Sequence, residues 1–260
     1  MGDSTFPAER PPAVAIQTLG AFRVWRDGRA VPSTEWRSRK ARDVLKILVA
    51  RRGRPTPRDL LVEALWPGGD PARTPNRLSV ALSTLRLTLD PAHRYGRERF
   101  IASDKGSVRV RLAAVAVDVE SFLADAEAGL RLHRRGRHAE AWRVLEATEA
   151  LYAGDFVEEN AYEDWAIALR EEARAAYLAV AAALGELALA SRDHDAAIRY
   201  RLRSLARDRY DERAHLALVS TLAAAGRYGE AERAYGAYVA RMEAIGVDAA
   251  PYAVCSNGAV

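Results

Sequence analysis

The chain has 260 residues, of which 49% are hydrophobic, and this length fits two domains more readily than one. Its single cysteine, Cys255, excludes an internal disulfide and a cysteine-based zinc site. We expect no apolar run long enough to span a membrane, and the polar, proline-rich first residues are unlike a secretory signal. The sequence therefore predicts a soluble, cytoplasmic protein.

Charge is divided unevenly along the chain. Residues 1–112 hold 22 of the 39 lysine and arginine residues and 11 of the 35 aspartate and glutamate residues, a net charge of +11. The remainder therefore carries −7 within a total of +4. Two well-solvated surfaces are the plainer explanation, but the size of the split favours a polyanion-binding module joined to an acidic partner module.

The first part of the chain predicts strands followed by a helix. Residues 1–13 are expected to be disordered. The segment VAIQTLGAFRVW, which starts at Val14, predicts short strands, and Asp27-Gly28 predicts a hairpin turn. The next segment predicts a helix with Gly53 as its C-cap and with an apolar face made of Ala41, Val44, Leu45, Leu48 and Val49.

Two further helices are each expected to begin at a Thr-Pro pair. Thr56 and Thr74 are predicted to cap free backbone N–H groups, and the proline after each fits the first helical turn. The second helix is expected to end at Pro67-Gly68. The third is expected to end at Asp90, because the proline that follows disfavours a helical conformation there.

The order of these elements predicts a winged helix-turn-helix domain. RFIASDKGSVRVRL predicts two strands joined by a tight turn around Lys105, and this hairpin would form the wing. The third helix would be the DNA-recognition helix. One of its faces carries leucines at helical spacing, namely Leu78, Leu82, Leu85 and Leu89.

The opposite face of the third helix carries short polar groups with arginines at its margins, which suits a helix in the DNA major groove. An ordinary amphipathic helix gives the same leucine spacing, but the basic surroundings favour DNA. The predicted base-reading residues are Asn76, Arg77, Val80, Ser83 and Thr84. Phosphate contacts are predicted for Trp36, Arg37, Arg39, Lys40, Arg54, Thr56, Arg58, Arg73, Thr74, Arg86, Lys105 and Arg109. For Arg58, simple solvation is an equal alternative.

From Val117 onward the sequence predicts helices throughout. Two helices are broken at Gly136, and after a loop come a long helix through Ala190 and two further hairpins. RDHDAAIRYRLRSL, from residue 192, aligns with GRYGEAERAYGAYV, from residue 226, with small residues at Ala197 and Ala231. This offset of 34 is typical of tetratricopeptide repeats. The segment from Gly136 is similar to the same unit but lies at a different offset.

Together these segments resemble SARP-type transcriptional activators, the antibiotic regulatory protein family. WRSRKARDVLKILVARRGRPTPRDLLVEALWPG and NRLSVALSTLRLTLDP resemble an OmpR/PhoB-type DNA-binding domain. DVESFLADAEAG, LYAGDFVEENAYEDWAIALREEAR and DERAHLALVSTLAAAGRYGEAERAY resemble the bacterial transcriptional activator domain. The resemblance covers roughly residues 14–252. It implies a mainly α fold with small β elements, with a winged helix over 14–112, a tetratricopeptide-like all-α domain over 113–252 and a flexible tail over 253–260.

The resemblance also implies a function. Such proteins bind double-stranded DNA at direct repeats near the −35 region, as homodimers at least on DNA. They recruit RNA polymerase through its sigma factor or alpha subunit, and they activate biosynthetic gene clusters for antibiotics. The family usually has arginine near the positions of Ser79 and Thr84, and its wing usually ends in a Gly-Tyr-Arg-Leu-like sequence where this chain has SVRVRL. The target DNA sequence is therefore not implied.

Two other functions compete with this interpretation. For an enzyme we find no paired catalytic groups, no phosphate-binding loop and no cofactor motif. The five histidines have no carboxylate or cysteine partners at ligand spacing, and the acidic residues Glu158, Glu159, Glu163 and Asp164 fit a solvated loop better than a metal site. The other alternative is a protein-interaction scaffold in which the winged helix docks proteins, although the +11 charge of residues 1–112 argues against it.

Overall fold

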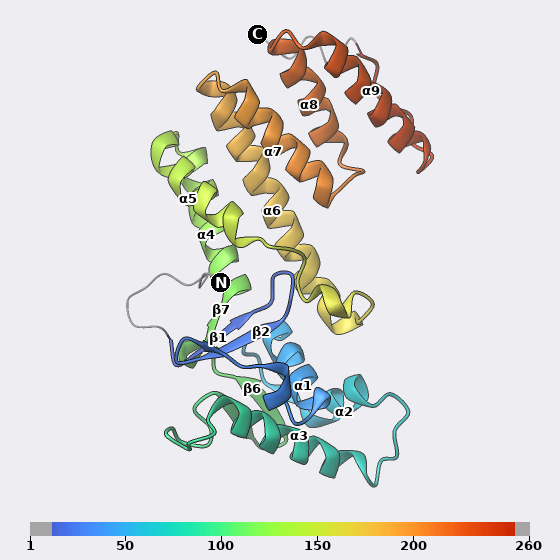
Figure 1. Ribbon diagram of the computed structural model, residues 1–260. Helices are drawn as coiled ribbons and strands as arrows, with labels where there is room; N and C mark the ends of the chain where they lie inside the picture. The colour runs from blue at the N-terminus through green and yellow to red at the C-terminus, as the bar shows by residue number, and fades with distance from the viewer. Residues whose placement is uncertain (1–11, 253–260) are drawn as a thin grey trace. The chain divides into compact units, whose positions relative to one another are not determined.

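The computed structural model describes residues 12–252 (Figure 1). They form two compact units, one made of the segment ending at Phe122 together with Leu151–Ala173, and one made of Leu123–Ala150 together with the segment from Arg174. The predicted disorder at the N-terminus falls almost wholly outside the described residues. The predicted flexible tail and Cys255 also lie outside them.

A small sheet opens the first unit. Its strands are β1 (Val14–Gln17), β2 (Arg23–Arg26), β3 (Arg29–Ala30) and β7 (Ala116–Val117), in the order β3-β2-β1-β7. β1 pairs antiparallel with β2 and parallel with β7. The predicted hairpin turn is confirmed: Asp27 and Gly28 both have positive φ, of 48° and 78°, a backbone conformation that this residue pair tolerates.

After the 3-10 turn η1 (Ser33–Glu35), three helices form the core of the winged helix: α1 (Arg39–Ala50), α2 (Arg58–Leu65) and α3 (Thr74–Leu89). Both α1 and α2 pack against α3. The apolar residues predicted for the inner face of α1 are all buried, and so are the four predicted leucines of α3. Hydrophobic periodicity therefore identified the inner faces of both helices correctly.

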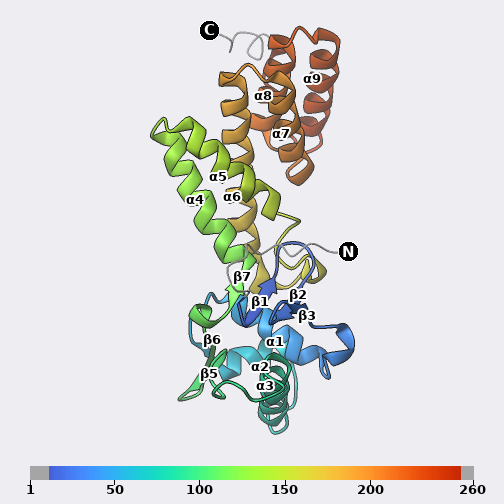
Figure 2. The same cartoon turned by 60° about the vertical axis from the view of Figure 1, so that its left-hand side comes forward.

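The wing is a three-stranded sheet beside α2 and α3 (Figure 2). Its strands β4 (Thr56–Pro57), β5 (Ile101–Asp104) and β6 (Ser107–Val110) lie in the order β4-β6-β5. β5 and β6 are antiparallel, and the turn at Lys105 and Gly106 joins them as predicted. The 3-10 turn η2 (Leu112–Ala114) follows and leads into β7.

The predicted helix caps need correction. Thr56 lies in β4 and is paired with Val108, so α2 begins two residues later without a side-chain cap. Thr74 is the first residue of α3, and its hydroxyl donates to the carbonyl of Asp70 (3.0 Å) instead of accepting from the helix. α1 ends at Ala50, before Gly53, because the chain already turns at Arg52, which has a φ of +51°.

Segments from later in the chain complete the first unit. The buried carboxylate of Asp118 accepts hydrogen bonds from the backbone N–H groups of Thr18 (2.7 Å) and Leu19 (2.9 Å). Lys46, only 4% exposed, forms an ion pair with Glu159. Its Nζ also donates to Oδ1 of Asn160 (2.7 Å). Residues 151–173 thus share contacts with the winged helix.

The second unit is helical. It draws on α4 (Asp118–Arg134), α5 (His138–Leu151), α6 (Asp164–Ala190), α7 (His194–Arg207), α8 (Glu212–Ala224) and α9 (Tyr228–Glu243). The loop before α6 contains a 3-10 turn, η3 (Glu158–Asn160), in the first unit. Two complete hairpins, which need four helices, were expected after α6, but within residues 12–252 three helices follow it. The reason is that α6 itself supplies the first arm of the α6–α7 hairpin.

The offset of 34 residues relates equivalent turns. Asp193 N–H donates to the carbonyl of Ala188, and Arg227 N–H donates to that of Leu222, both at 2.9 Å. The turns at Arg192 and Gly226 both have positive φ. In the α4–α5 turn, the N–H of Arg137 donates to the carbonyl of Leu132 in the same way, at 3.0 Å. The related hairpin at Gly136 therefore has the predicted geometry, at an offset that differs from 34.

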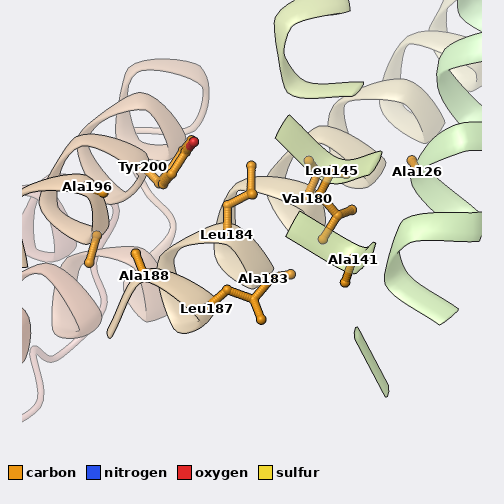
Figure 3. Packing of buried hydrophobic residues seen from close by; sticks show 11 residues of the cluster. Ala126, Ala141, Leu145, Val180, Ala183, Leu184, Leu187, Ala188, Ala196 and Tyr200 are labelled. Carbon is orange, nitrogen blue, oxygen red and sulfur yellow. The ribbon is translucent and has the colours of Figure 1, made fainter. Parts of the chain in front are cut away.

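Small residues allow these helices to approach closely. Ala141, Ala197 and Ala231 occupy the same position after each turn, and each has 0% exposure. Figure 3 shows the core that Ala126, Ala141, Leu145, Val180 and Leu184 help to build, with side chains from α4, α5, α6 and α7. The fold class is confirmed: a winged helix with small sheets, followed by a tetratricopeptide-like helical array.

One expectation about hydropathy was wrong. α6 is long and apolar enough to cross a membrane by length and composition, although we expected no such run. Half of its most apolar stretch is buried within the structure. The core helix of a folded domain passes the same test of length and composition, so this feature is weak evidence for a membrane span.

Candidate nucleic-acid interface

Helix α3 has well-defined ends. At its start, the N–H groups of Arg73 and Thr74 donate to the carbonyl of Asp70, at 3.0 and 3.1 Å. At its end, the carboxylate of Asp90 accepts from the N–H groups of Arg94 (2.9 Å) and Tyr95 (2.8 Å). These hydrogen bonds fix the turns before and after α3, and both ends of the helix are therefore anchored to the rest of the domain.

The outward face of α3 brings most of the predicted base-reading residues together. Asn76, Arg77, Val80 and Ser83 are exposed, and Thr84 is half-buried. Val80 is 58% exposed, although valine side chains are usually buried. A shallow hollow of about 440 Å³ crosses this face and is lined by Arg37, Asn76, Ser79, Val80, Ser83, Thr84 and Leu87. Arg77 does not line the hollow.

Arginines gather on the wing side of α3. The guanidinium of Arg58 donates to the Ser79 hydroxyl (2.8 Å), and that of Arg86 donates to the Ser103 hydroxyl (2.6 Å). With Arg97 they line a polar hollow of about 330 Å³. Burial lowers the pKa of Arg86, and the positive charges of Arg97 and Arg58 act in the same direction. Three arginines and one carboxylate, that of Glu98, line this hollow, so positive charge is in excess there.

Arg97 was not among the predicted contacts. The sequence contained a signal that points to it, since Arg94, Arg97 and Arg99 follow one another closely in the loop after α3. On the other side of α3, Arg37 is exposed and lines both the shallow hollow and a second one beside Thr84 and Thr88. Arg26 anchors β2 there by donating to the carbonyl of Thr88 (2.9 Å).

The remaining predicted phosphate contacts fall into two groups. Exposed side chains are those of Arg39, Arg54, Arg73, Lys105 and Arg109. The others make internal contacts: Trp36 packs near Phe22, Lys40 donates to the carbonyl of Leu65 (2.7 Å), and Thr56 and Thr74 are buried.

The acidic loop makes internal contacts. Glu158 accepts from the N–H of Asp155 (2.9 Å), Glu159 pairs with Arg42 (3.0 Å) and Lys46, and Glu163 accepts from the indole of Trp165 (3.0 Å). Over residues 12–252, no group of three histidine, cysteine, aspartate or glutamate side chains is arranged to hold a metal ion.

Comparisons with known proteins identify the family of the chain. A family model described as the bacterial transcriptional activator domain matches residues 117–253. The transcriptional regulatory protein MoaR1 of Mycobacterium tuberculosis is 29% identical over 135 residues, which are 52% of this chain and 42% of MoaR1. The transcriptional regulatory protein EmbR of the same organism is 31% identical over 169 residues, which are 64% of this chain and 42% of EmbR.

The fold itself also has a solved counterpart. The structure of Mycobacterium tuberculosis EmbR in complex with a low-affinity phosphopeptide has a TM-score of 0.76 and 25% identity. The match covers 93% of this chain and 63% of the EmbR chain, so this chain spans less than two thirds of the length of these relatives. The family model covers more than half of the chain and directly follows a winged helix. The chain thus belongs to the bacterial transcriptional activator domain family, with the SARP-type arrangement of a winged helix ahead of that domain.

Proposed function

We propose that this protein is a cytoplasmic, DNA-binding transcriptional activator. One observation carries the proposal: the outward face of α3 presents small and polar side chains, while arginines from three other segments flank it. A helix that packed inside the protein would cover Val80 and Asn76. Exposed short side chains are able to reach base edges, and the flanking arginines suit phosphate oxygens.

We assign base reading to Asn76, Arg77, Val80, Ser83 and Thr84. The exposed or hollow-lining basic residues are assigned to phosphates, namely Arg37, Arg39, Arg54, Arg58, Arg73, Arg86, Lys105 and Arg109, with Arg97 added to them. Phosphate contacts of Trp36, Lys40, Thr56 and Thr74 stay predictions that the internal contacts of these residues do not favour.

The finer features follow from the family. We propose that two protomers bind a direct repeat near the −35 region, with their recognition helices about one DNA turn, roughly 10–11 base pairs, apart or a multiple of that. RNA polymerase would be recruited through its sigma factor or alpha subunit. The regulated genes would form a cluster for a secondary metabolite such as an antibiotic.

A binding selection on randomised DNA tests the assignment of α3. Each good bidentate contact contributes about 1–3 kcal/mol of discrimination between bases. Asn76→Ala and Arg77→Ala are therefore expected to relax preference at particular positions, while nonspecific affinity persists. Arg213→Ala is the control, since Arg213 is an exposed arginine in the second unit. If both α3 variants returned the wild-type motif with equal information at every position, α3 would not be the reader.

Salt dependence separates this function from the scaffold alternative. Release of counterions from neutralised phosphates makes DNA affinity fall steeply with salt, by about 0.9 logarithmic units per contact for each tenfold rise in concentration. A DNA-binding protein with the proposed contacts is expected to show a steep slope. A winged helix that serves only to dock proteins would give no measurable DNA binding even at low salt.

A further inference from the structure

A second kind of cavity lies beside the recognition helix. The C-terminal half of α3 and the loop after it border a space of about 420 Å³. Its apolar walls are Leu87, Tyr95, Phe100 and Ile101. The rings of Tyr95 and Phe100 meet edge to face, with their centroids 5.4 Å apart. The volume lies within the range of small-molecule sites, and the aromatic walls suit a flat ring.

Positive charge is in excess at this cavity, where two arginines face one carboxylate. Arg86 and Arg97 both line it. Arg86 donates to the Ile101 carbonyl and the Ser103 hydroxyl, which are neutral acceptors, and Arg97 makes no hydrogen bond or ion pair with residues 12–252. The single carboxylate in the lining is that of Asp90, and its two oxygens already accept from the backbone N–H groups of Arg94 and Tyr95. Glu98 lines the neighbouring polar hollow, where it accepts from the N–H of Ser103 (3.3 Å).

The walls distinguish this cavity from that hollow. Arg58, Ser79 and Ser103 line the polar hollow, and such hydrogen-bonding groups suit a DNA phosphate. Phe100 and Ile101 are buried apolar residues. Their side chains cannot donate hydrogen bonds to a phosphate, which would lose its hydrating water there. An aromatic ring with one carboxylate fits both the apolar walls and the arginines of this cavity. The ring packs against the apolar walls, and a planar carboxylate can pair with a guanidinium through two hydrogen bonds.

We propose that this cavity binds a small aromatic carboxylate, with its ring against Leu87, Tyr95 and Phe100 and its carboxylate at Arg86 and Arg97. The ligand lowers DNA affinity, because it cancels positive charge on two arginines that also line the phosphate hollow. Ser83 lines both this cavity and the hollow on the base-reading face of α3, so a bound ligand lies next to that face. The effect on DNA rests on the proposed function, whereas ligand binding does not.

The test titrates the full chain with 1-naphthoate and follows heat release in the absence of DNA. Two matched controls separate the parts of the ligand: 1-naphthamide keeps the ring without the charge, and acetate keeps the charge without the ring. Saturable binding is expected for 1-naphthoate, with each control about tenfold weaker or more. Arg97→Gln is expected to weaken binding by about fivefold or more. Arg99→Gln removes an exposed arginine of the same loop that does not line the cavity, so it is expected to bind normally.

The site is overturned if 1-naphthoate gives no saturable binding, if the amide binds equally well, or if Arg97→Gln and Arg99→Gln behave alike. DNA binding is measured separately on the ligand-free chain. Failure there overturns the proposed function and leaves the ligand site standing. If DNA binds but saturating 1-naphthoate leaves its affinity unchanged, the regulatory link is wrong.

Discussion

At the scale of single residues, arginines that look alike in the sequence have different surroundings. Arg170 is buried and donates to the carbonyls of Phe156, Ala161 and Asn160. Arg52 is ion-paired with Glu120 and Glu172, both at 2.8 Å, and these partners raise its pKa. Arg37 is exposed beside the recognition helix. Arg37 is therefore available to DNA, whereas Arg170 and Arg52 would first have to give up their internal contacts.

The salt dependence of DNA binding distinguishes these kinds of residue. Arg37→Ala and Lys105→Ala are each expected to weaken binding to all sequences alike and to reduce the salt slope by about one unit, because each removes one phosphate contact. Lys40→Met is the matched control, since the Lys40 ammonium donates to Leu65 and lies 5.9 Å from the centre of the Trp66 ring. An unchanged slope for both Arg37→Ala and Lys105→Ala would contradict the assigned phosphate contacts.

At the scale of elements, the hairpins of the second unit depend on small residues where two helices cross. Ala231 in α9 is fully buried, in a core with Leu218, Val219 and Leu222 of α8. Ala237, six residues further along the same helix, is exposed. The same helix therefore offers a crowded alanine and an open one.

Thermal or denaturant unfolding of the full chain tests this packing. Ala231→Trp is expected to cost roughly 1–3 kcal/mol or more, because the core has no room for an indole ring. Ala237→Trp places the same ring in solvent and is expected to change stability by less than about 0.5 kcal/mol. Equal stability for the two variants would show that the α8–α9 crossing lies in a different register.

The turn between α2 and α3 is the element that we assign to polymerase. Pro71 and Ala72 are exposed there, just before α3. Substituting both is expected to leave DNA affinity unchanged while abolishing promoter activation, because neither is among the side chains assigned to bases or phosphates. Gly69 is a poor choice, since a side chain there would meet Thr74 and the Trp66 carbonyl below 3.0 Å. A scan in which each inactive variant also lost DNA binding would contradict a separate polymerase contact.

At the scale of the whole molecule, the compact unit that holds the winged helix also contains residues 151–173. Segment 151–173 adds Glu159 and Asn160 to the buried Lys46, and it adds Phe156, which pairs with Leu19 in an isolated β-bridge. Residues 151–173 lie within the segment that the family model matches, yet they belong to the same compact unit as the winged helix.

A double-mutant cycle in the full chain measures this link. Glu159→Gln is expected to destabilise the protein by about 1–3 kcal/mol, because it leaves the Lys46 ammonium buried without its main carboxylate partner. Lys46→Met in the Glu159→Gln background is expected to recover part of that loss, since no buried charge then remains. Strictly additive effects on the free energy of unfolding would mean that the two residues are not coupled.

The sequence by itself determined the elements and their faces. Leucine spacing fixed which side of α3 is buried, Asp27-Gly28 marked a turn, and a 34-residue offset located equivalent hairpin turns. These signals are local, because side-chain periodicity and turn conformation depend on neighbours within a few residues. The candidate base-reading face was predictable for that reason, once its opposite face was known to be apolar.

The tertiary structure decided which polar groups remain available. Lys46 and Asn160 are 114 residues apart in the chain, and Arg52 and Glu172 are 120 apart, so no local pattern could pair them. Thr56 is drawn into the wing sheet by its pairing with Val108, which overrides its preference for a helix cap. The aromatic cavity arises in the same way, because Leu87 and Phe100 become neighbours only when the loop after α3 folds back. Burial and ion pairing depend on what the rest of the chain brings close, and this is why only the folded structure assigns them.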